Sequence, residues 1–194
     1  MIPPLEPGSP PPLAPALWLR YLRTQWRRVV GPNLSQVDSM LYVGGEFSLA
    51  AWPALHALGV RAVLSLQGER EDAFCDPLPL RTLRLEVRDF HPPSLEQLDQ
   101  AVAFLRESRA QGMPTLVHCH AGVGRAPLTA AAFLVAEGAS YAEALGRIYH
   151  ARPIIRLNGR QRRRLAEWEA RARATPPTGT PSPAAGRSGS ASAG

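Results

Sequence analysis

Short apolar runs alternate with longer segments of helical character along most of this chain. Runs with the length and composition of β-strands cover positions 34–37, 40–43, 61–66, 80–87 and 115–117. Segments that predict helices cover positions 48–58, 94–111, 128–138, 141–149 and 158–173. Strands that alternate with helices predict an α/β fold, in which a single, mostly parallel central sheet is flanked by helices on both faces.

Composition places the boundaries of this domain. The chain has 194 residues, which is enough for one domain with a substantial core. Its 20 prolines cluster towards the two ends. We therefore expect a disordered, Pro-rich lead at 1–15, a separate helix at 16–32, the folded domain at 33–173 and a disordered tail at 174–194.

The predicted helix at 16–32 is both aromatic and basic. Leu17, Trp18, Tyr21, Leu22, Trp26 and Val29 recur at helical spacing, with arginines between them. We expect the aromatic face to pack on the domain while the arginine head groups stay in water. The alternative is that this helix lies on a membrane surface.

One stretch carries the candidate chemistry, and it runs from His118 and Cys119 to Arg125. It follows a buried strand and precedes a helix rich in small residues, so it forms a tight loop between them. In open α/β sheets, ligands bind at such strand ends. Inward N–H groups and the positive end of the helix dipole favour a bound anion there, and they favour a thiolate over a thiol at Cys119.

A cysteine and an arginine at this spacing suit the hydrolysis of phosphate esters. The Cys119 thiolate would attack phosphorus, and the Arg125 guanidinium would hold two phosphate oxygens in a bidentate fork. The other residues expected to form the phosphate site are His118, His120, Ala121, Gly122, Val123 and Gly124. Their N–H groups from position 120 onward would bind the remaining oxygens. Gly122 and Gly124 would let the backbone turn, and His118 would hydrogen-bond to nearby backbone and fix the loop.

The leaving alcohol also needs a proton donor. Asp89 lies 30 positions before Cys119, at the end of the predicted strand 80–87 and on a loop stiffened by Pro92 and Pro93. We expect Asp89 to protonate the leaving oxygen and then to activate the water that cleaves the cysteinyl phosphate. This chemistry needs no metal or other cofactor, and the sequence shows no cluster of metal ligands.

Charge and cysteine content narrow the partners and the compartment. The net charge is +6, which favours anionic partners: we expect a phosphorylated protein or a phosphoinositide, peripheral membrane contact through the Arg-rich helices, and no nucleic acid. Two cysteines, Cys75 and Cys119, are too few for a disulfide framework, so we expect a cytoplasmic protein. Cys75 could instead pair with Cys119 as a redox switch. We see neither an apolar run of about 20 residues nor a secretory signal.

His118, Cys119 and Arg125, with Asp89 upstream, resemble the cysteine-based protein tyrosine phosphatases, and within them the small dual-specificity phosphatases. The resemblance covers roughly residues 33–173. The run Ala121–Pro127 is most similar to the phosphatases of regenerating liver. The resemblance implies catalytic roles for Cys119, Arg125 and Asp89, and phosphotyrosine and phosphoserine/threonine as substrates.

One residue departs from that family. Most members have Ser or Thr directly after the arginine, where the hydroxyl stabilises the departing thiolate, whereas this chain has Ala126. The resemblance therefore implies slow breakdown of the phosphoenzyme. Three alternatives stay open: a phosphoinositide or inositol-phosphate phosphatase on the same scaffold, a slow or inactive phosphatase that binds phosphorylated partners, and another cysteine-loop chemistry such as sulfur transfer or arsenate reduction.

Overall fold

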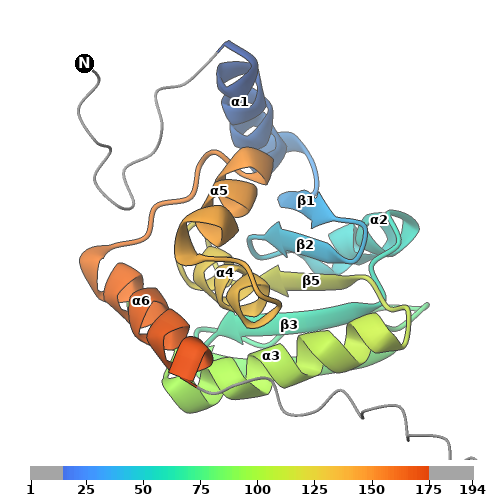
Figure 1. Cartoon of the computed structure of the whole chain (residues 1–194). Coiled ribbons are helices and arrows are strands. Elements are labelled where there is room, and N and C mark those ends of the chain that lie inside the picture. The colour runs from blue at the N-terminus through green and yellow to red at the C-terminus, as the bar shows by residue number, and fades with distance from the viewer. Residues whose placement is uncertain (1–14, 175–194) are drawn as a thin grey trace, which may run out of the picture.

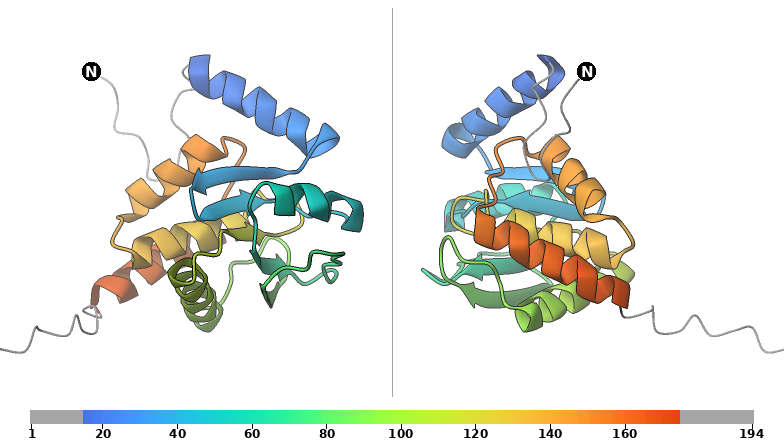
Figure 2. Two further views of the ribbon diagram at one scale, coloured as in Figure 1. Left: turned by 90° about the vertical axis from the view of Figure 1, so that its right-hand side faces the viewer. Right: turned by 60° about the vertical axis from the view of Figure 1, so that its left-hand side comes forward.

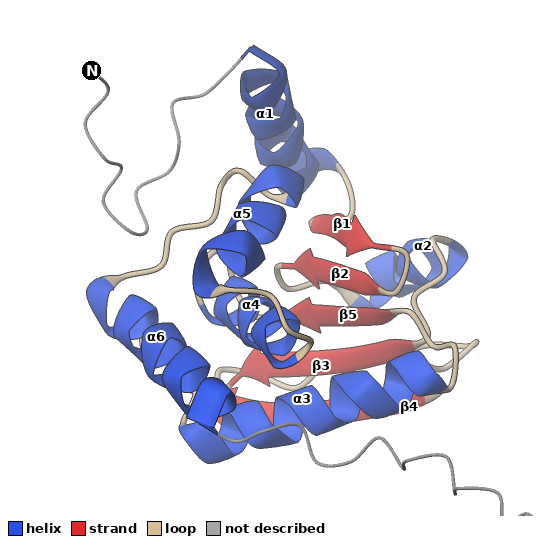
Figure 3. Cartoon of the chain, viewed as in Figure 1, coloured by secondary structure: helices blue, strands red, loops and turns tan. Residues whose placement is uncertain are grey.

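The computed structural model describes residues 15–174, and it is organised around one five-stranded sheet (Figures 1 and 3). The strands are β1 (Leu34–Asp38), β2 (Leu41–Gly44), β3 (Ala62–Gln67), β4 (Arg81–Val87) and β5 (Thr115–His118), in the order β1-β2-β5-β3-β4. Only β1 runs antiparallel to its neighbour; the other pairs are parallel. The predicted lead and tail fall almost entirely outside the described residues.

Helices cover both faces of the sheet, as predicted (Figures 1 and 2). The elements are α1 (Pro15–Val30), the short 3₁₀ turn η1 (Leu49–Ala51), α2 (Trp52–Ala57), α3 (Leu95–Ala110), α4 (Arg125–Ala136), α5 (Tyr141–Ala151) and α6 (Gly159–Ala174). Helices α3 to α6 lie over one face, and α2 covers the other. No helix among the described residues has both the length and the apolar character required to cross a membrane.

The alternation of side chains along the strands builds one core on each face. On β3, Leu64 and Leu66 belong to the cluster under α3 to α6, whereas Val63 packs in the smaller cluster around Trp52 of α2. All six residues of β3 are buried, as expected for an inner parallel strand. Strand β4 lies at the edge of the sheet and carries exposed polar side chains, as its alternating pattern predicted.

Local signals set the helix ends well. Ser94 and Gln97 form a reciprocal capping box at the start of α3. Gly112 and Gly138, which follow α3 and α4, have φ of +67° and +99°. The predicted helix 48–58 is shorter than expected, because Pro53 lacks an N–H and fits only the first turn, so the α-helix begins at Trp52 and no cap bond forms at position 48.

The expected packing of the first helix is wrong. Trp18, Leu22 and Trp26 are exposed, and the side that meets the domain carries Thr24 and the half-buried Tyr21. Thr24 tolerates burial because its hydroxyl donates to the Arg20 carbonyl at 2.8 Å. Helical periodicity shows that a helix has two different faces, but it does not show which of them the domain covers.

Candidate active site

The ends of three parallel strands place the Cys119–Arg125 loop. Gly44 of β2 and Ser65 of β3 both pair with His118, the last residue of β5. Cys119 follows immediately, is 2% exposed and belongs to the core cluster under α4. Arg125 begins α4 and is 1% exposed. The structure therefore brings the predicted nucleophile and the predicted guanidinium together at the carboxyl edge of the sheet.

The carbonyl groups of positions 120–123 are all bonded to groups outside the loop. Each accepts a hydrogen bond from outside the loop: His120 from the Glu46 N–H at 2.9 Å, Ala121 from Arg152 Nη2 at 3.5 Å, Gly122 from Arg152 Nε at 2.6 Å and Val123 from the Arg156 N–H at 2.7 Å. Within residues 15–174, no N–H of positions 120–125 donates to a protein acceptor. These N–H groups are therefore available to a ligand, and such a nest of amides binds anions.

Close backbone approach explains the glycines. Gly122 has a φ of +66°, and a Cβ there would lie 2.4 Å from the carbonyl of Gly44. A Cβ on Gly124 would lie 2.9 Å from Nε2 of Gln161, at the start of α6. The predicted role of Gly122 and Gly124 in the turn thus has a second reason, which is contact with β2 and with α6.

Arg152 holds the Cys119–Arg125 loop in place through hydrogen bonds to its carbonyls. It was not identified as a site residue from the sequence. Its guanidinium is 0% exposed, and besides its bonds to the loop, Nη2 donates to Oδ1 of Asn33 at 2.7 Å. It therefore holds two loop carbonyls and the segment before β1 at once. The burial of an arginine depends on tertiary contacts, which the spacing of residues along the chain does not show.

One edge of the Arg125 guanidinium, Nε–Nη2, makes no hydrogen bond, although Nη2 lies beside two carboxylates. Nη1 donates to the carbonyls of Leu66 and Val87, at 3.3 and 2.7 Å, and to Oε2 of Glu69 at 3.0 Å. Nε is buried and has no hydrogen-bond partner among the described residues. Nη2 lies 3.0 Å from an oxygen of Glu69 and 3.0 Å from Oδ1 of Asp89, but it makes no hydrogen bond of good geometry. The Nε–Nη2 edge can thus take the bidentate fork that a phosphate offers.

Glu69 is a second site residue that the sequence did not single out. It pairs with both terminal nitrogens of Arg125, and the hydrogen bond from Arg125 lowers the pKa of the Glu69 carboxyl. Burial alone would lower the pKa of the Arg125 guanidinium, but the bond to Glu69 and the charges of Cys119 and Asp89 outweigh it and raise that pKa. Arg125 is therefore held firmly in its charged form.

Asp89 lies at the mouth of the loop. It follows β4 and is about half exposed, and Oδ1 faces Nη2 of Arg125 at 3.0 Å. Its neighbour Phe90 is 74% exposed and has a φ of +59°. The segment 88–93, named here the acid loop, is held by α6: Nδ2 of Asn158 donates to the Phe90 carbonyl at 2.7 Å, and Nε2 of Gln161 donates to the His91 carbonyl at 3.5 Å.

The two histidines of the loop have different surroundings. His118 is fully buried, and its Nε2 lies 2.8 Å from Oδ2 of Asp72, so the expectation that it bonds to nearby backbone is wrong. The reason is that the 69–72 segment folds back over the strand ends and supplies a carboxylate. His120 is half exposed, and its Nδ1 lies 3.1 Å from Oε2 of Glu46.

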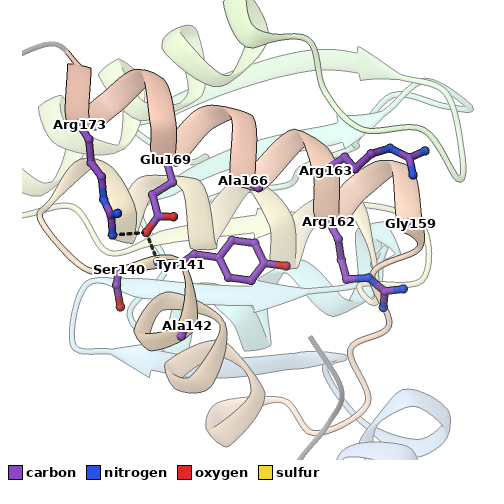
Figure 4. A pocket seen from close by; sticks show the side chains of 9 residues that line it. All are labelled: Ser140, Tyr141, Ala142, Gly159, Arg162, Arg163, Ala166, Glu169 and Arg173. Carbon is purple, nitrogen blue, oxygen red and sulfur yellow. Dashed lines mark hydrogen bonds and ion pairs between the residues drawn. The ribbon is translucent and has the colours of Figure 1, made fainter. Parts of the chain in front are cut away.

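Other candidate features lie away from this loop. Cys75 and Cys119 are both free thiols, and they pack in the clusters on opposite faces of the sheet. Across residues 15–174, no group of three His, Cys, Asp or Glu side chains is placed to hold a metal ion. A groove of about 640 Å³ lies between α5 and α6, lined by Tyr141, Ala166 and Arg162 among others, and it includes no residue of the Cys119–Arg125 loop (Figure 4).

Comparison with known proteins agrees with this geometry. The profile of the dual specificity phosphatase catalytic domain matches residues 41–171. The chain belongs to this family. The dual specificity protein phosphatase 12 of Homo sapiens is 36% identical over 106 residues, which cover 53% of this chain and 31% of that protein. The chain thus spans about a third of the length of that relative.

Other similar proteins match over more of their own length. The phosphatidylglycerophosphate phosphatase PTPMT2 of Arabidopsis thaliana is 28% identical over 139 residues, which cover 69% of this chain and 61% of that protein. The structure of PTPMT1 in complex with PI(5)P has a TM-score of 0.66 at 24% identity and covers 73% of this chain and 97% of that one. Human DUSP28 has a TM-score of 0.67 at 23% identity, covering 74% and 97%. These structures share the dual-specificity phosphatase fold.

Proposed function

We propose that this dual-specificity phosphatase domain hydrolyses phosphomonoesters through a cysteinyl-phosphate intermediate. The observation that carries the proposal is the open Nε–Nη2 edge of the buried Arg125, beside a nest of unbonded N–H groups with Cys119 at its start. A buried guanidinium and amides without partners are costly unless an anion completes their hydrogen bonds. A phosphoryl group has the charge and the oxygens to do so.

The residues then divide the reaction between them. The Cys119 thiolate attacks phosphorus, an S–P bond forms and the P–O bond to the leaving group breaks, while Asp89 gives its proton to the leaving oxygen. Arg125 and the amides of His120, Ala121, Gly122, Val123 and Gly124 bind the three other oxygens. Asp89 then takes a proton from water, which attacks phosphorus and releases Cys119 as a thiolate. We place His118 behind this site as a support and His120 at its rim.

Ala126 affects only the last of these steps. It is 0% exposed and packs in the same cluster as Cys119, in the first turn of α4. Alanine has no hydroxyl that could donate to the departing thiolate, so we expect the second step to limit turnover. Capture of the phosphoryl group, which depends on the loop and on Arg125, stays fast.

A rapid-quench assay with para-nitrophenyl phosphate tests the proposal. We expect a burst of about one equivalent of nitrophenol followed by slow turnover, and none from Cys119→Ser. Ala126→Ser should raise the steady rate about tenfold, the scale of one hydrogen bond to a charged group. Linear release from the start, with no response to Ala126→Ser, would contradict the slow second step. No hydrolysis by the wild type, with binding of phosphopeptides retained, would instead favour a phosphate-dependent binding module.

The substrate class is the second part of the proposal. We favour phosphotyrosine and phosphoserine/threonine in proteins, with phosphoinositides or inositol phosphates as the alternative. The name of the Arabidopsis relative and the ligand of the PTPMT1 structure support the lipid alternative. Arg160, exposed beside the acid loop with Nη1 3.4 Å from Nε2 of His91, could bind a second phosphate. Rates on a panel of phosphopeptides and phosphoinositides decide between them. The two free thiols suit the cytoplasmic location that we also propose.

A further inference from the structure

Helix α1 lies at the β1 end of the molecule and meets the domain with only one of its faces (Figures 1 and 2). On that face, Thr24 is buried and Nη1 of Arg20 donates to the His150 carbonyl of α5 at 3.2 Å. Nε2 of Gln25 donates to the Tyr21 hydroxyl at 2.9 Å. The burial of Thr24 and the bond from Arg20 to α5 orient the helix about its own axis, and so they decide which side chains face away from the domain.

The outward face is a continuous apolar stripe. Trp18, Leu19, Leu22 and Trp26 are 51%, 65%, 42% and 68% exposed. With 3.6 residues per turn, these positions fall within an arc of about 100° on the helix. Single exposed apolar residues are ordinary on protein surfaces, but four large ones on one helix face mark a binding surface.

The charge of α1 indicates which kind of partner binds to this surface. The sequence of α1 contains four arginines and no acidic residue. Arg23 is exposed and lies next to the stripe by helical position. Indole rings and leucines beside arginines suit the boundary between lipid head groups and acyl chains, where the rings enter the boundary and the guanidinium groups meet anionic head groups. A second copy of this chain, with the same net charge of +6, would repel such a helix.

The position of α1 connects the stripe to the active site. Only Gly31 and Pro32 separate Val30, the last residue of α1, from Asn33. The carbonyl of Asn33 accepts from the Gly45 N–H at 2.8 Å, and its side chain accepts from Arg152 under the Cys119–Arg125 loop. A surface that holds α1 is therefore connected to the Cys119–Arg125 loop through Asn33 and Arg152.

We propose that the outward stripe of α1 docks the domain on an anionic lipid surface, with Trp18, Leu19, Leu22 and Trp26 in the interface. This inference does not depend on the substrate of the phosphatase, because it concerns a face that contributes no residue to the active site. Its effect is to raise the local concentration of the enzyme where membrane-bound phosphomonoesters are present.

The full chain and vesicles of stated composition test the proposal. Vesicles of phosphatidylcholine with 30% phosphatidylserine are compared with phosphatidylcholine alone by co-sedimentation. We expect the wild type to bind the anionic vesicles, and we expect Trp18→Ala with Trp26→Ala to lower the partition coefficient at least tenfold. Leu58→Ala with Leu80→Ala is the matched control, since both side chains are exposed elsewhere on the domain, and it should bind like the wild type.

Two further readouts separate the outcomes. Trp52 and Trp168 are buried, so a blue shift of tryptophan fluorescence on vesicle addition reports α1. Turnover of soluble para-nitrophenyl phosphate should be equal in wild type and double variant, so loss of docking is distinguishable from loss of catalysis. No binding to anionic vesicles, or equal binding by the double variant, would overturn the proposal. So would a wild-type dimer in sedimentation velocity that the double variant loses, because the stripe would then be covered by a second copy.

Discussion

The floor of the active site and the acid loop above it are built in different ways. In the floor, residues 119–125, the side chains of Cys119 and Arg125 are buried, and every carbonyl from position 120 to 123 has a partner outside the loop. The acid loop, residues 88–93, places Asp89 and Phe90 in solvent, and the contacts that α6 makes to it are mostly with its backbone. The floor is held in place through its carbonyls, whereas the acid loop is held through its backbone and leaves the side chain of Asp89 half exposed.

This difference separates two contributions to catalysis. A preorganised floor stabilises the transferring phosphoryl group whatever it is attached to. Proton donation matters in proportion to how poor the leaving group is. Substitutions in the floor should therefore slow the first step by the same factor for every substrate. Substitutions that act through the acid loop should slow it more for alkyl than for nitrophenyl phosphates.

The largest effect is expected from Asp89→Asn. Without a proton donor, the first step should slow by about 10²- to 10⁴-fold on a phosphoserine peptide and much less on para-nitrophenyl phosphate, whose leaving group needs little protonation. Single-turnover rates on both substrates measure this. Glu86→Gln, an exposed carboxylate near the end of β4, is the control and should change neither rate. An equal loss on both substrates would show that Asp89 supports Arg125 rather than donating a proton.

Arg152→Lys tests the floor. A lysine keeps the charge but cannot reach the carbonyls of Ala121 and Gly122 and the side chain of Asn33 at once. We expect the first step to slow by about 10²-fold, equally for both substrates, because the loop shifts. Urea unfolding should show a loss of about 1–3 kcal/mol from the buried acceptors left unpaired. Arg147→Lys, exposed on α5, which ends just before Arg152, is the control. A loss of rate that is larger for the phosphoserine peptide than for para-nitrophenyl phosphate would contradict the division between floor and acid loop.

The sequence predicts the residues of the floor better than the residues that hold the floor in place. The reason is the sequence separation between the contacting residues. The spacing of Cys119 and Arg125, the capping box at Ser94 and the strand that leads to Asp89 are local patterns. The partners that hold the site are distant: Arg152 lies 30 positions from Gly122, and Glu69 lies 56 positions from Arg125. No local sequence pattern indicates that two such distant residues contact each other.

The errors have the same origin. The sequence gives His118 no local carboxylate, and Asp72 reaches it only because the loop after β3 folds back over a separation of 46 positions. The sequence predicts a helix here, but contacts with α5 and β1 decide which of its faces the domain covers, as the bond from Arg20 to the His150 carbonyl shows. Amphipathic spacing alone could not tell the covered face from the free one.

A smaller effect is expected from Asn158→Asp, which changes one contact of the acid loop. Asp keeps the acceptor that Gln161 uses at the start of α6 but loses the donor to the Phe90 carbonyl. The first step should slow by about three- to tenfold, the scale of one hydrogen bond, and more for the phosphoserine peptide than for the nitrophenyl ester. The free energy of unfolding should stay nearly constant, because Asp and Asn cap helices equally well. Equal slowing on both substrates would place Asn158 with the floor.

The smallest effect concerns Glu69, which faces Arg125 from the side of the floor. The bond from Arg125 lowers the Glu69 pKa from its usual 4.5, so the folded state is stabilised above about pH 4.5, and this contribution is lost as the pH falls through the lowered value. Glu69→Gln removes it. Because Glu69 is 41% exposed, we expect a difference in the free energy of unfolding below about 1 kcal/mol at pH 7. That difference should shrink as the pH falls from 4.5 through the lowered pKa of Glu69. Urea unfolding at pH 7 and at a series of pH values below 4.5 measures it. A difference that persists at low pH would mean that Glu69 stabilises the fold through packing, and the charge of Arg125 would then be held in place by Asp89 and the acid loop.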